Sequence, residues 1–421
     1  MKKILSVTTF TGMLTLLRMA AGFLMAKVIA IYLGPTGMAM LGQVQNIVAI
    51  LNGLITAPVS PALIRYTAEN FDGSYLKCSP WWRASLGWVL IFILILIPIF
   101  YLLSDILSLW LFGSEQYSYL IKIIALCLPI SVVGIIINAI NNGLQRYKKY
   151  VILGMISVII STSVMVLLVI YKNVDGALLA ISIQNAIIGF ILLMLSINEP
   201  WLKFKYWIGK INKTDFLSIL RYILMALTSA LALPTALLLL RNTLIANVGW
   251  DITGQWQAVW KISDAYLAVM TLALSTYYLP ILSKTNTLKE LKHEIKSVAK
   301  VIIPITIILS SIIYIFREFI IRLLFTDTFN EAESLFLLQL IGDNIKIVAW
   351  LYAYPLIAYG IAKWYIIAEI VFAIIFVCLG HFFVLYYGVD GANLAYLCAY
   401  IFYLIFTFIL VNKVIPYSKL R

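Results

Sequence analysis

The sequence predicts an all-α polytopic membrane protein with about twelve transmembrane helices in two six-helix lobes, and three observations support this fold class. Of the 421 residues, 63% are hydrophobic and only 12% are charged, whereas a soluble domain carries about a quarter charged residues. Clusters of Gly, Pro, Asn and Asp divide the chain into apolar runs. A helix of roughly 20 apolar residues is long enough to cross a bilayer. Lysine and arginine gather in alternate connections between these runs. The composition therefore requires lipid as the solvent.

The apolar runs give the predicted helices in order. Residues 1–197 form an N-terminal lobe with helices near 5–32, 38–64, 84–103, 118–141, 150–171 and 176–197. Residues 215–421 form a C-terminal lobe with helices near 215–240, 252–281, 297–316, 333–357, 364–386 and 391–412. The Lys- and Asn-rich stretch 198–214 is the expected cytoplasmic linker. Gly34-Pro35-Thr36-Gly37 is expected to form a four-residue outer turn between the first two helices.

The charge distribution predicts the orientation. Met1-Lys2-Lys3 precedes an apolar run that continues to Gly34, so we expect a retained first helix rather than a cleaved secretory signal. With the amino terminus inside, most of the 31 Lys and Arg residues fall in cytoplasmic segments, and the outer segments hold only Lys122, Lys172, Arg241, Arg317 and Arg322. This asymmetry predicts a bacterial inner-membrane protein with both termini cytoplasmic. The net charge of +13 then indicates topology and contact with anionic lipid, not nucleic acid.

An internal repeat supports two lobes of the same orientation. Residues 174–180 read VDGALLA and residues 389–395 read VDGANLA, an offset of 215, and each motif opens the last helix of a set. At nearly the same offset, Lys27 and Arg241 lie near the outer end of the first helix of a set. Two parallel repeats are related by an axis along the membrane normal. Two such lobes that face each other would enclose a central cleft, which is typical of transporters.

Ionisable residues inside the predicted helices mark a candidate site. There are seven: Arg18, Lys27, Lys261, Asp264, Asp343, Lys346 and Glu369. Each costs on the order of 3 kcal/mol to place in the middle of a membrane. A bundle that is only structural has no need of them, so we expect them to serve a function.

Their spacing predicts where they point. Three predicted helices each carry a polar stripe along one face. The stripes consist of Gln339, Asp343, Lys346, Trp350 and Tyr354; of Gln257, Lys261, Asp264, Thr271 and Ser275; and of Thr11, Thr15, Arg18 and Gly22. Polar faces on several helices must converge on a wet cavity, because lipid does not solvate them. The alternative is that Lys261–Asp264 and Asp343–Lys346 are self-neutralising pairs that only join helices. Lys27 is equally compatible with snorkelling to the outer interface.

The residue types suggest roles for the cavity. Arg18, Lys27, Lys261, Lys346 and Gln339 are the candidate substrate-binding residues, because guanidinium and ammonium groups bind a diphosphate by charge-assisted hydrogen bonds. Asp264, Asp343 and Glu369 are the candidate sites for uptake of a proton or a sodium ion, or for an ion pair in the cavity. Glu369 is equally placed to be a structural partner of Lys363 or Tyr365.

Other features limit the chemistry. Two histidines and four cysteines without CxxC spacing argue against a metal site. No GxxxxGK[ST] phosphate loop occurs, so an ion gradient or the gradient of the substrate would have to drive transport. The basic segment 284–300 is expected to be an amphipathic helix on the cytoplasmic surface.

Three segments carry a resemblance to a known family. KISDAYLAVMTLALSTYYLPILS (261–283), FLLQLIGDNIKIVAWLYAYPLIAYGIAKWYIIAEI (336–370) and RMAAGFLMAKVIAIYLGPTG (18–37) resemble the Wzx-type O-antigen and lipid III flippases of the polysaccharide transport family. The resemblance implies the MATE-like fold of the multidrug/oligosaccharidyl-lipid/polysaccharide exporters, alternating access and an undecaprenyl-diphosphate-linked glycan as substrate. It also implies cavity roles for Arg18, Lys27, Lys346, Asp264 and Asp343, whereas Lys261 departs from the family pattern.

The expected function is therefore flipping of a lipid-linked oligosaccharide, and the expected partners include the polymerase and the chain-length regulator of the same pathway. Two alternatives stay open at this point. A cation-coupled exporter of small drugs would use the same fold, although its cavity would favour acidic and aromatic side chains. An O-antigen polymerase or ligase would need a sizeable outer loop, and the longest outer stretch expected is about 316–333.

Overall fold

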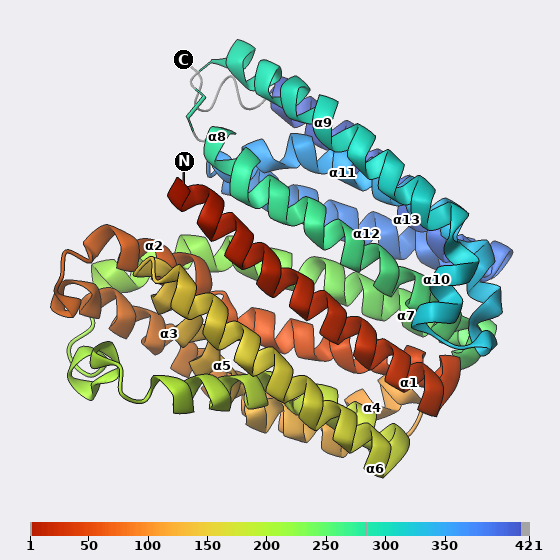
Figure 1. Cartoon of the computed structure of the whole chain (residues 1–421), viewed down its shortest axis with the longest axis horizontal. Coiled ribbons are helices and arrows are strands. Elements are labelled where there is room, and N and C mark those ends of the chain that lie inside the picture. The colour runs from red at the N-terminus through yellow and green to blue at the C-terminus, as the bar shows by residue number, and fades with distance from the viewer. Residues whose placement is uncertain (1, 283, 286, 414–421) are drawn as a thin grey trace. The chain divides into compact units, whose positions relative to one another are not determined.

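The computed structural model describes residues 2–282, 284–285 and 287–413, without the side chains of residues 2–10, 60, 61, 218, 221, 222 and 225. Across these residues the chain forms α-helices joined by short turns, with no β-strand (Figure 1). The predicted all-α class is thus confirmed. The basic residues Lys419 and Arg421, on which the cytoplasmic placement of the carboxyl terminus partly depends, lie outside the described residues, as do the side chains of Lys2, Lys3 and Arg221.

Nine helices in the described part of the chain are long and apolar enough to cross a membrane, and three of them are double-length. These three are α1 (Lys2–Thr56), α6 (Tyr147–Ser196) and α7 (Lys213–Ala273). Each contains one residue with non-helical backbone angles: Gly34 in α1, Asn173 in α6 and Gly249 in α7. Because each part is long enough to cross a bilayer, the nine helices provide the dozen crossings that the sequence predicts.

The repeat extends well beyond the seven-residue motif. Gly34 (φ 63°) and Gly249 (φ 82°) are 215 residues apart, as are Asn173 (φ 50°, ψ −124°) and Gly388 (φ 59°, ψ −136°). The same offset carries the end of α5 (Ser118–Gly143) onto the end of α11 (Phe336–Ala358). It also carries the two parts of α6 onto α12 (Ala362–Tyr387) and α13 (Val389–Lys413). One backbone plan is therefore used twice in the chain.

The repeated glycine of the VDG motif explains why its turn is so tight. A Cβ atom on Gly176 would overlap the carbonyl oxygen of Leu168, and one on Gly391 would overlap that of Phe383. The acceptor lies eight residues before the glycine in both copies. The motif is thus a device that lets two consecutive helices touch through their backbones.

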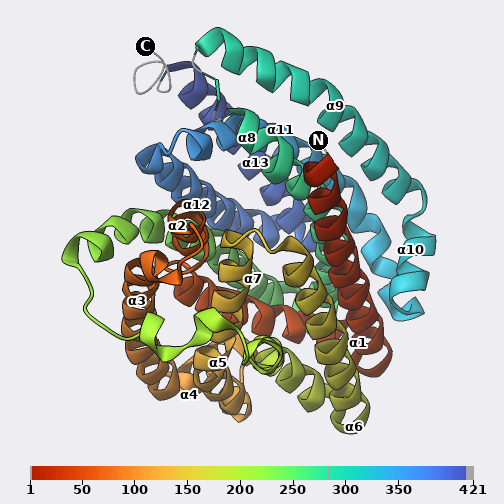
Figure 2. The same cartoon turned by 60° about the vertical axis from the view of Figure 1, so that its left-hand side comes forward.

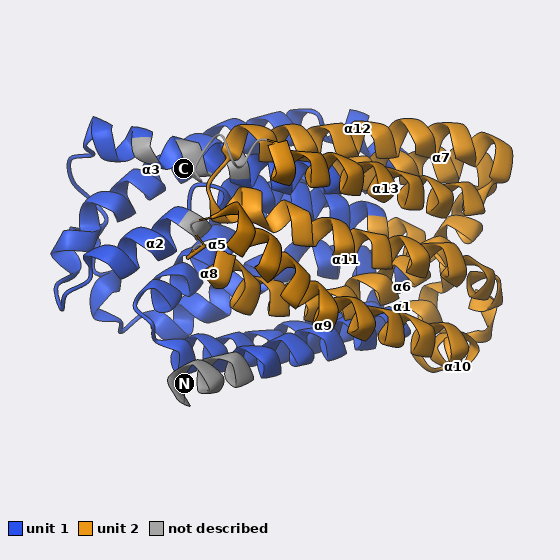
Figure 3. Ribbon diagram, turned by 90° about the horizontal axis from the view of Figure 1, so that it is seen from above, with its two compact units in different colours: residues 1–28, 43–234 blue, residues 29–42, 235–421 orange. Residues whose placement is uncertain are grey.

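Contacts divide the chain into two compact units, shown in different colours in Figure 3. Unit 1 comprises residues 1–28 and 43–234, and unit 2 comprises residues 29–42 and 235–421. The predicted lobe boundaries at 197 and 215 stay a prediction.

Unit 1 contains α2 (Ser60–Asn70), α3 (Tyr75–Leu102), α4 (Ser104–Phe112), η1 (Glu115–Tyr117), α5 and α6, and the turns η2 (Pro200–Leu202) and η3 (Phe204–Tyr206). α5 packs along α6, where a Cβ on Gly134 would lie 2.7 Å from the Cα of Gly189. Small residues allow such close backbone approach between membrane helices, where lipid gives no hydrophobic drive.

Unit 2 contains η4 (Leu274–Tyr278), α8 (Leu279–Leu282), α9 (Leu288–Ile315), α10 (Arg317–Leu324) and η5 (Asp327–Leu335), followed by α11, α12 and α13. α11 packs against α9, α12 and α13, which makes it the central helix of this group. α9 and α10 run along one side of unit 2 (Figure 1, Figure 2). α11 carries three of the eight predicted site residues, Gln339, Asp343 and Lys346, and all three are buried in the interior of unit 2.

Several predicted boundaries differ from the structure for identifiable reasons. The helix expected at 297–316 begins at Leu288, because Thr287 accepts a hydrogen bond from the backbone of Glu290 and caps it. The amphipathic segment 284–300 is therefore largely the first part of α9. The helix expected at 84–103 begins at Tyr75 after the cap Ser74. The stretch 316–333, predicted to lie outside, is mostly helical, as α10 and η5.

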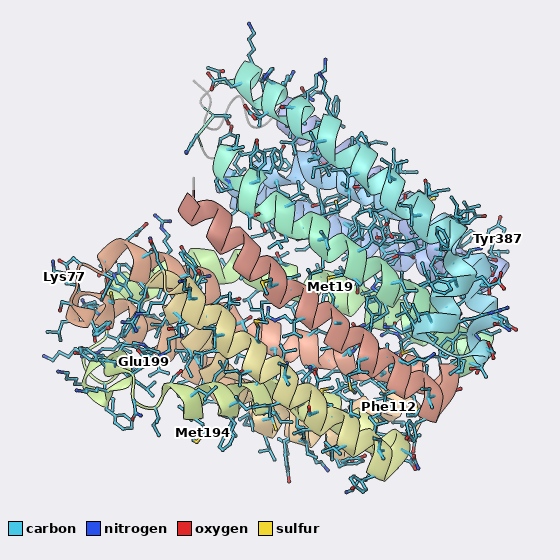
Figure 4. The ribbon with its side chains drawn as sticks, viewed as in Figure 1. Met19, Lys77, Phe112, Met194, Glu199 and Tyr387 are labelled. Carbon is cyan, nitrogen blue, oxygen red and sulfur yellow. The ribbon has the colours of Figure 1, made fainter. Side chains whose placement is uncertain are left out.

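The predicted linker 198–214 is fastened to the rest of unit 1. The carboxylate of Glu199 pairs with Arg146 at 2.8 Å and with Lys149, and Arg83 donates to the carbonyl of Lys205 at 2.8 Å. Partial burial opposes ionisation of Glu199, but the hydrogen bond from Lys149 and the two nearby cations lower the pKa of this carboxyl below its ordinary value. Lys77 and Glu199 lie at one end of unit 1 and Phe112 lies near the other (Figure 4).

Candidate functional site

Asp343 on α11 is the centre of a polar cluster in unit 2. Its side chain is completely buried. Tyr396 of α13 donates to Oδ1 at 2.8 Å, Tyr266 of α7 donates to Oδ2 at 2.8 Å, and Gln339 donates to Oδ1 at 3.3 Å. Three donors on one carboxyl group favour its ionised form. Of the predicted face, Gln339, Asp343 and Lys346 are buried, whereas Trp350 and Tyr354 are half-buried. That this face lines a wet cavity stays a prediction.

Lys346 lies one turn from Asp343 and is enclosed by aromatic rings. Its ammonium nitrogen lies 5.0 Å from the ring centroid of Trp350, 5.5 Å from that of Tyr400, 5.7 Å from that of Tyr396 and 6.0 Å from that of Trp260. The negative faces of aromatic rings attract a cation, and the attraction is strongest when water is excluded. With 3% of its surface exposed, Lys346 meets that condition.

Glu369 of α12 extends the cluster. Its Oε1 accepts a hydrogen bond of 2.8 Å from the hydroxyl of Tyr403 on α13. The charge of Lys346 acts on the carboxyl groups of Glu369, Asp343 and Asp264 alike. Lys346 thus acts as a counter-charge for three carboxyl groups contributed by α7, α11 and α12, and Lys261 acts on Asp264 as well.

The second polar stripe, on α7, is less buried. Lys261 is half-buried and Asp264 is exposed. Among the described residues, neither Lys261–Asp264 nor Asp343–Lys346 forms a direct ion pair. Charge still acts within both couples, from Lys261 on Asp264 and from Lys346 on Asp343. The alternative of self-neutralising pairs that only join helices therefore stays open.

Arg241 corrects one prediction. The sequence placed it in an outer segment, but it lies inside α7 with 1% of its surface exposed. Its Nη2 donates to Oε1 of Gln257 at 2.6 Å, and its guanidinium lies 5.7 Å from the ring centroid of Trp256. A Cβ on Gly42 would approach the guanidinium carbon to 2.8 Å, so the absence of a side chain there makes room for Arg241. In a sequence, an arginine near the end of an apolar run looks like a residue of the following loop. For this reason Arg241 was assigned to an outer segment.

Arg18 and Lys27 lie on α1 in unit 1. Arg18 is exposed, and because residues two apart on an α-helix differ by about 200°, it points away from the exposed apolar Leu16. Lys27 is half-buried. The chamber that these residues are predicted to share with Lys346 stays a prediction.

Sequence reasoning missed the aromatic part of the cluster. Tyr266, Trp260, Tyr396, Tyr400 and Tyr403 looked like ordinary apolar-helix residues. A signal was present, because the last three follow i, i+4 and i+7 on α13 and so share one face. Among the described residues no group of three or more His, Cys, Asp or Glu side chains is placed to hold a metal ion.

These features define a multi-pass membrane protein with a polar cluster enclosed in one unit. The model of the family described as "Polysaccharide biosynthesis protein" matches residues 4–286, two thirds of the sequence. The chain belongs to this family. It is 28% identical over 398 residues to the "Lipid III flippase" of Escherichia coli (strain K12) and to that of Shigella flexneri, covering 94% of this chain and 94% of each relative.

Solved structures show the same fold. The inward-facing conformation of a multidrug resistance MATE family transporter aligns with a TM-score of 0.75 at 16% identity, covering 99% of both chains. The "Lipid II flippase MurJ, inward closed conformation" aligns with a TM-score of 0.70, covering 97% of this chain and 88% of that chain. The expected MATE-like fold is confirmed.

Proposed function

We propose that the protein is a flippase that moves an undecaprenyl-diphosphate-linked oligosaccharide repeat unit from the cytoplasmic to the periplasmic leaflet by alternating access. The observation that carries the proposal is the similarity to two lipid III flippases, because it spans 94% of both chains rather than one motif. The fold shared with a lipid II flippase is consistent with it. The substrate is an O-antigen unit or a related lipid-linked glycan.

The proposed binding roles follow from charge. Arg18, Lys27, Lys261 and Lys346 supply positive charge for the diphosphate, and Gln339 supplies an amide. Lys346 is buried among rings, so it reaches a substrate only when the cluster opens or acts on it through the field of its charge. The polyprenyl tail stays in lipid during transport.

Energy for transport comes in this proposal from an ion gradient. Asp264, Asp343 and Glu369 take up and release the coupling proton or sodium ion, and no ATP is hydrolysed. The protein resides in the inner membrane with both termini cytoplasmic, and it hands its product to the polymerase and chain-length regulator of the pathway. It acts as a secondary transporter rather than an enzyme.

The test is complementation of a flippase-null strain, with radiolabelled lipid-linked intermediates followed on both membrane faces. Arg18→Ala and Lys346→Ala are expected to insert normally but to leave the glycan on the cytoplasmic face. Lys172→Ala, which removes an exposed lysine from α6, is the matched control and should complement fully. Full surface glycan in the Arg18→Ala strain would exclude that residue from the mechanism.

A cation-coupled drug exporter is the second candidate, because the fold is also that of MATE transporters. Identity to them is only 16%, so the likeness extends to the fold alone. Export of a fluorescent organic cation by the purified protein in vesicles, with no effect on glycan in cells, would favour this candidate.

A further inference from the structure

The polar cluster of unit 2 holds more negative than positive groups away from water. Asp343 is completely buried, and Glu369 is half-buried with its carboxyl bound to Tyr403. An ionised carboxylate in such surroundings needs a cation close by, since desolvation otherwise opposes its charge. Which cation fills this role decides which ion the site exchanges.

The chain supplies its own cation at this place. Four aromatic rings from α7, α11 and α13 surround the ammonium of Lys346 at 5.0 to 6.0 Å. Such boxes in other proteins hold free organic cations. Here the box is occupied by a side chain tethered to the same helix as Asp343. The described side chain of Lys346 makes no direct ion pair with Asp343, but its charge acts on that carboxyl group. The positive charge that a mobile metal cation would bring is therefore already supplied by the chain.

The hydrogen bonds around Asp343 favour a proton over a metal ion. A hard metal cation needs several oxygen lone pairs directed at it. Tyr266 and Tyr396 instead direct their hydroxyl hydrogens at the two carboxylate oxygens, and Gln339 adds an N–H. A metal ion bound to this carboxylate would have to displace these donors.

A proton can be accommodated without such displacement. The Oε1 of Gln339 is buried and has no hydrogen-bond partner. When a proton binds the Asp343 carboxylate, the new O–H must donate, and a half-turn of the Gln339 amide brings Oε1 to the place of its NH2 group. No other bond forms or breaks, Lys346 keeps its charge, and the net charge of the cluster rises by one.

We infer that Lys346 in its aromatic box takes the place of a metal cation, so that Asp343 exchanges protons and the site is indifferent to sodium. The inference rests on the proposed function for its role in transport. It names Lys346 as the residue that determines ion specificity and Gln339 as a positioning residue for the proton.

The other groups that face Asp343 fit this assignment. α7 contributes Tyr266, Ser263 and Asp264, and α13 contributes Tyr396 and Tyr400. Lys261 acts on Asp264, and Glu369 of α12 is reached by the charge of Lys346. α9 meets α11 at Asn344 through the neutral hydroxyl of Ser310. Among these groups, Lys346 is the cation whose charge acts on Asp343.

The test measures sodium binding to purified protein in detergent, without any glycan. Thermal unfolding is followed from about 1 to 150 mM sodium chloride, with potassium chloride at matched ionic strength as the reference, because an organic cation would enter the aromatic box that Lys346→Ala leaves empty. Wild type and Lys346→Arg are expected to show equal Tm values in both salts. Lys346→Ala is expected to open the site, so that sodium raises its Tm by on the order of 3 °C. Saturable sodium stabilisation of the wild type, lost in Asp343→Asn, would overturn the inference.

A second readout follows the proton itself and needs no folded Lys346→Ala protein. Infrared difference spectra of the wild type between pH 8 and pH 5 should show a buried carboxylic acid band that Asp343→Asn removes and Gln339→Leu shifts. A wild-type spectrum without that band contradicts the inference. Neither measurement depends on glycan flipping. Failure of glycan complementation would therefore refute the proposed function, whereas the sodium and infrared measurements alone decide this inference.

Discussion

Removing the Tyr396 hydroxyl should weaken unit 2 by a predictable amount. Tyr396 has 1% of its surface exposed, and its ring packs so closely on α11 that a Cβ on Gly342 would lie 2.5 Å from its Cδ1. The ring of Tyr396→Phe therefore has nowhere else to go, and only the 2.8 Å hydrogen bond to Asp343 is lost.

The size of the loss depends on whether Asp343 is ionised. A hydrogen bond to a charged group contributes about 1.5–3 kcal/mol, whereas interhelical hydrogen bonds in membrane proteins average about 0.6 kcal/mol. Since three donors favour the ionised form, we expect a loss of about 1.5 kcal/mol. For a unit of this size that corresponds to a Tm lower by roughly 3–6 °C.

The assay is thermal unfolding in detergent as a double-mutant cycle with Asp343→Asn. In the Asn background the acceptor is neutral, so Tyr396→Phe should cost only about 0.6 kcal/mol. Tyr386→Phe, which changes a tyrosine with 70% of its surface exposed, is the control and should leave Tm unchanged. An equal cost of Tyr396→Phe in both backgrounds would refute the argument that Asp343 is ionised.

Three further predictions follow from other contacts. Gly391→Ala should lower stability by about 1–3 kcal/mol, because its Cβ overlaps a backbone carbonyl, whereas Gly22→Ala in an open helical position should raise it by up to about 1 kcal/mol; thermal unfolding distinguishes the two. Glu199→Gln should expose the segment 198–212 to trypsin. A segment that stays uncleaved in limited proteolysis would contradict the claim that the Glu199 ion pairs hold it in place. The pKa of Glu199 is lower in the folded state than the ordinary value of about 4.3. Its contribution of about 1 kcal/mol to stability is therefore complete above that ordinary value and is lost as the pH falls through the folded pKa. A Tm series down to pH 3, compared with the same series for Glu199→Gln, measures this loss. Arg241→Met should keep its ring contact but leave Gln257 without its donor, so we expect a loss of about 1–3 kcal/mol in the same assay.

Much of the fold could be predicted because lipid imposes simple rules. Apolar length and charge placement gave the helices, and a 3.6-residue period gave the face of Gln339, Asp343 and Lys346. The breaks within the long helices were harder to predict. Gly34 interrupts α1 at a single residue, where the sequence suggested a four-residue turn. The cap of α9 at Thr287 was visible as a Thr-x-x-Glu pattern and was overlooked.

The site was predicted only in its charged part. Charges stand out in an apolar helix, whereas Trp260, Tyr396 and Tyr400 have the composition of any membrane segment. Their role depends on which helices meet at Lys346, and tertiary packing decides that. That Arg18 and Lys346 share a chamber stays a prediction, because local sequence patterns do not encode how helices are arranged.

The doubled backbone plan separates what the helices need from what the chemistry needs. Subtracting 215 from Asp343 and Lys346 leads to Leu128 and Ser131 of α5, which are buried as well. An ancestral duplication would have left two interchangeable bundles, of which one kept an inert interior while the other became ionic. The pair Asp343→Leu with Lys346→Ser would return the second bundle to the inert pattern, and it should fold while transporting nothing.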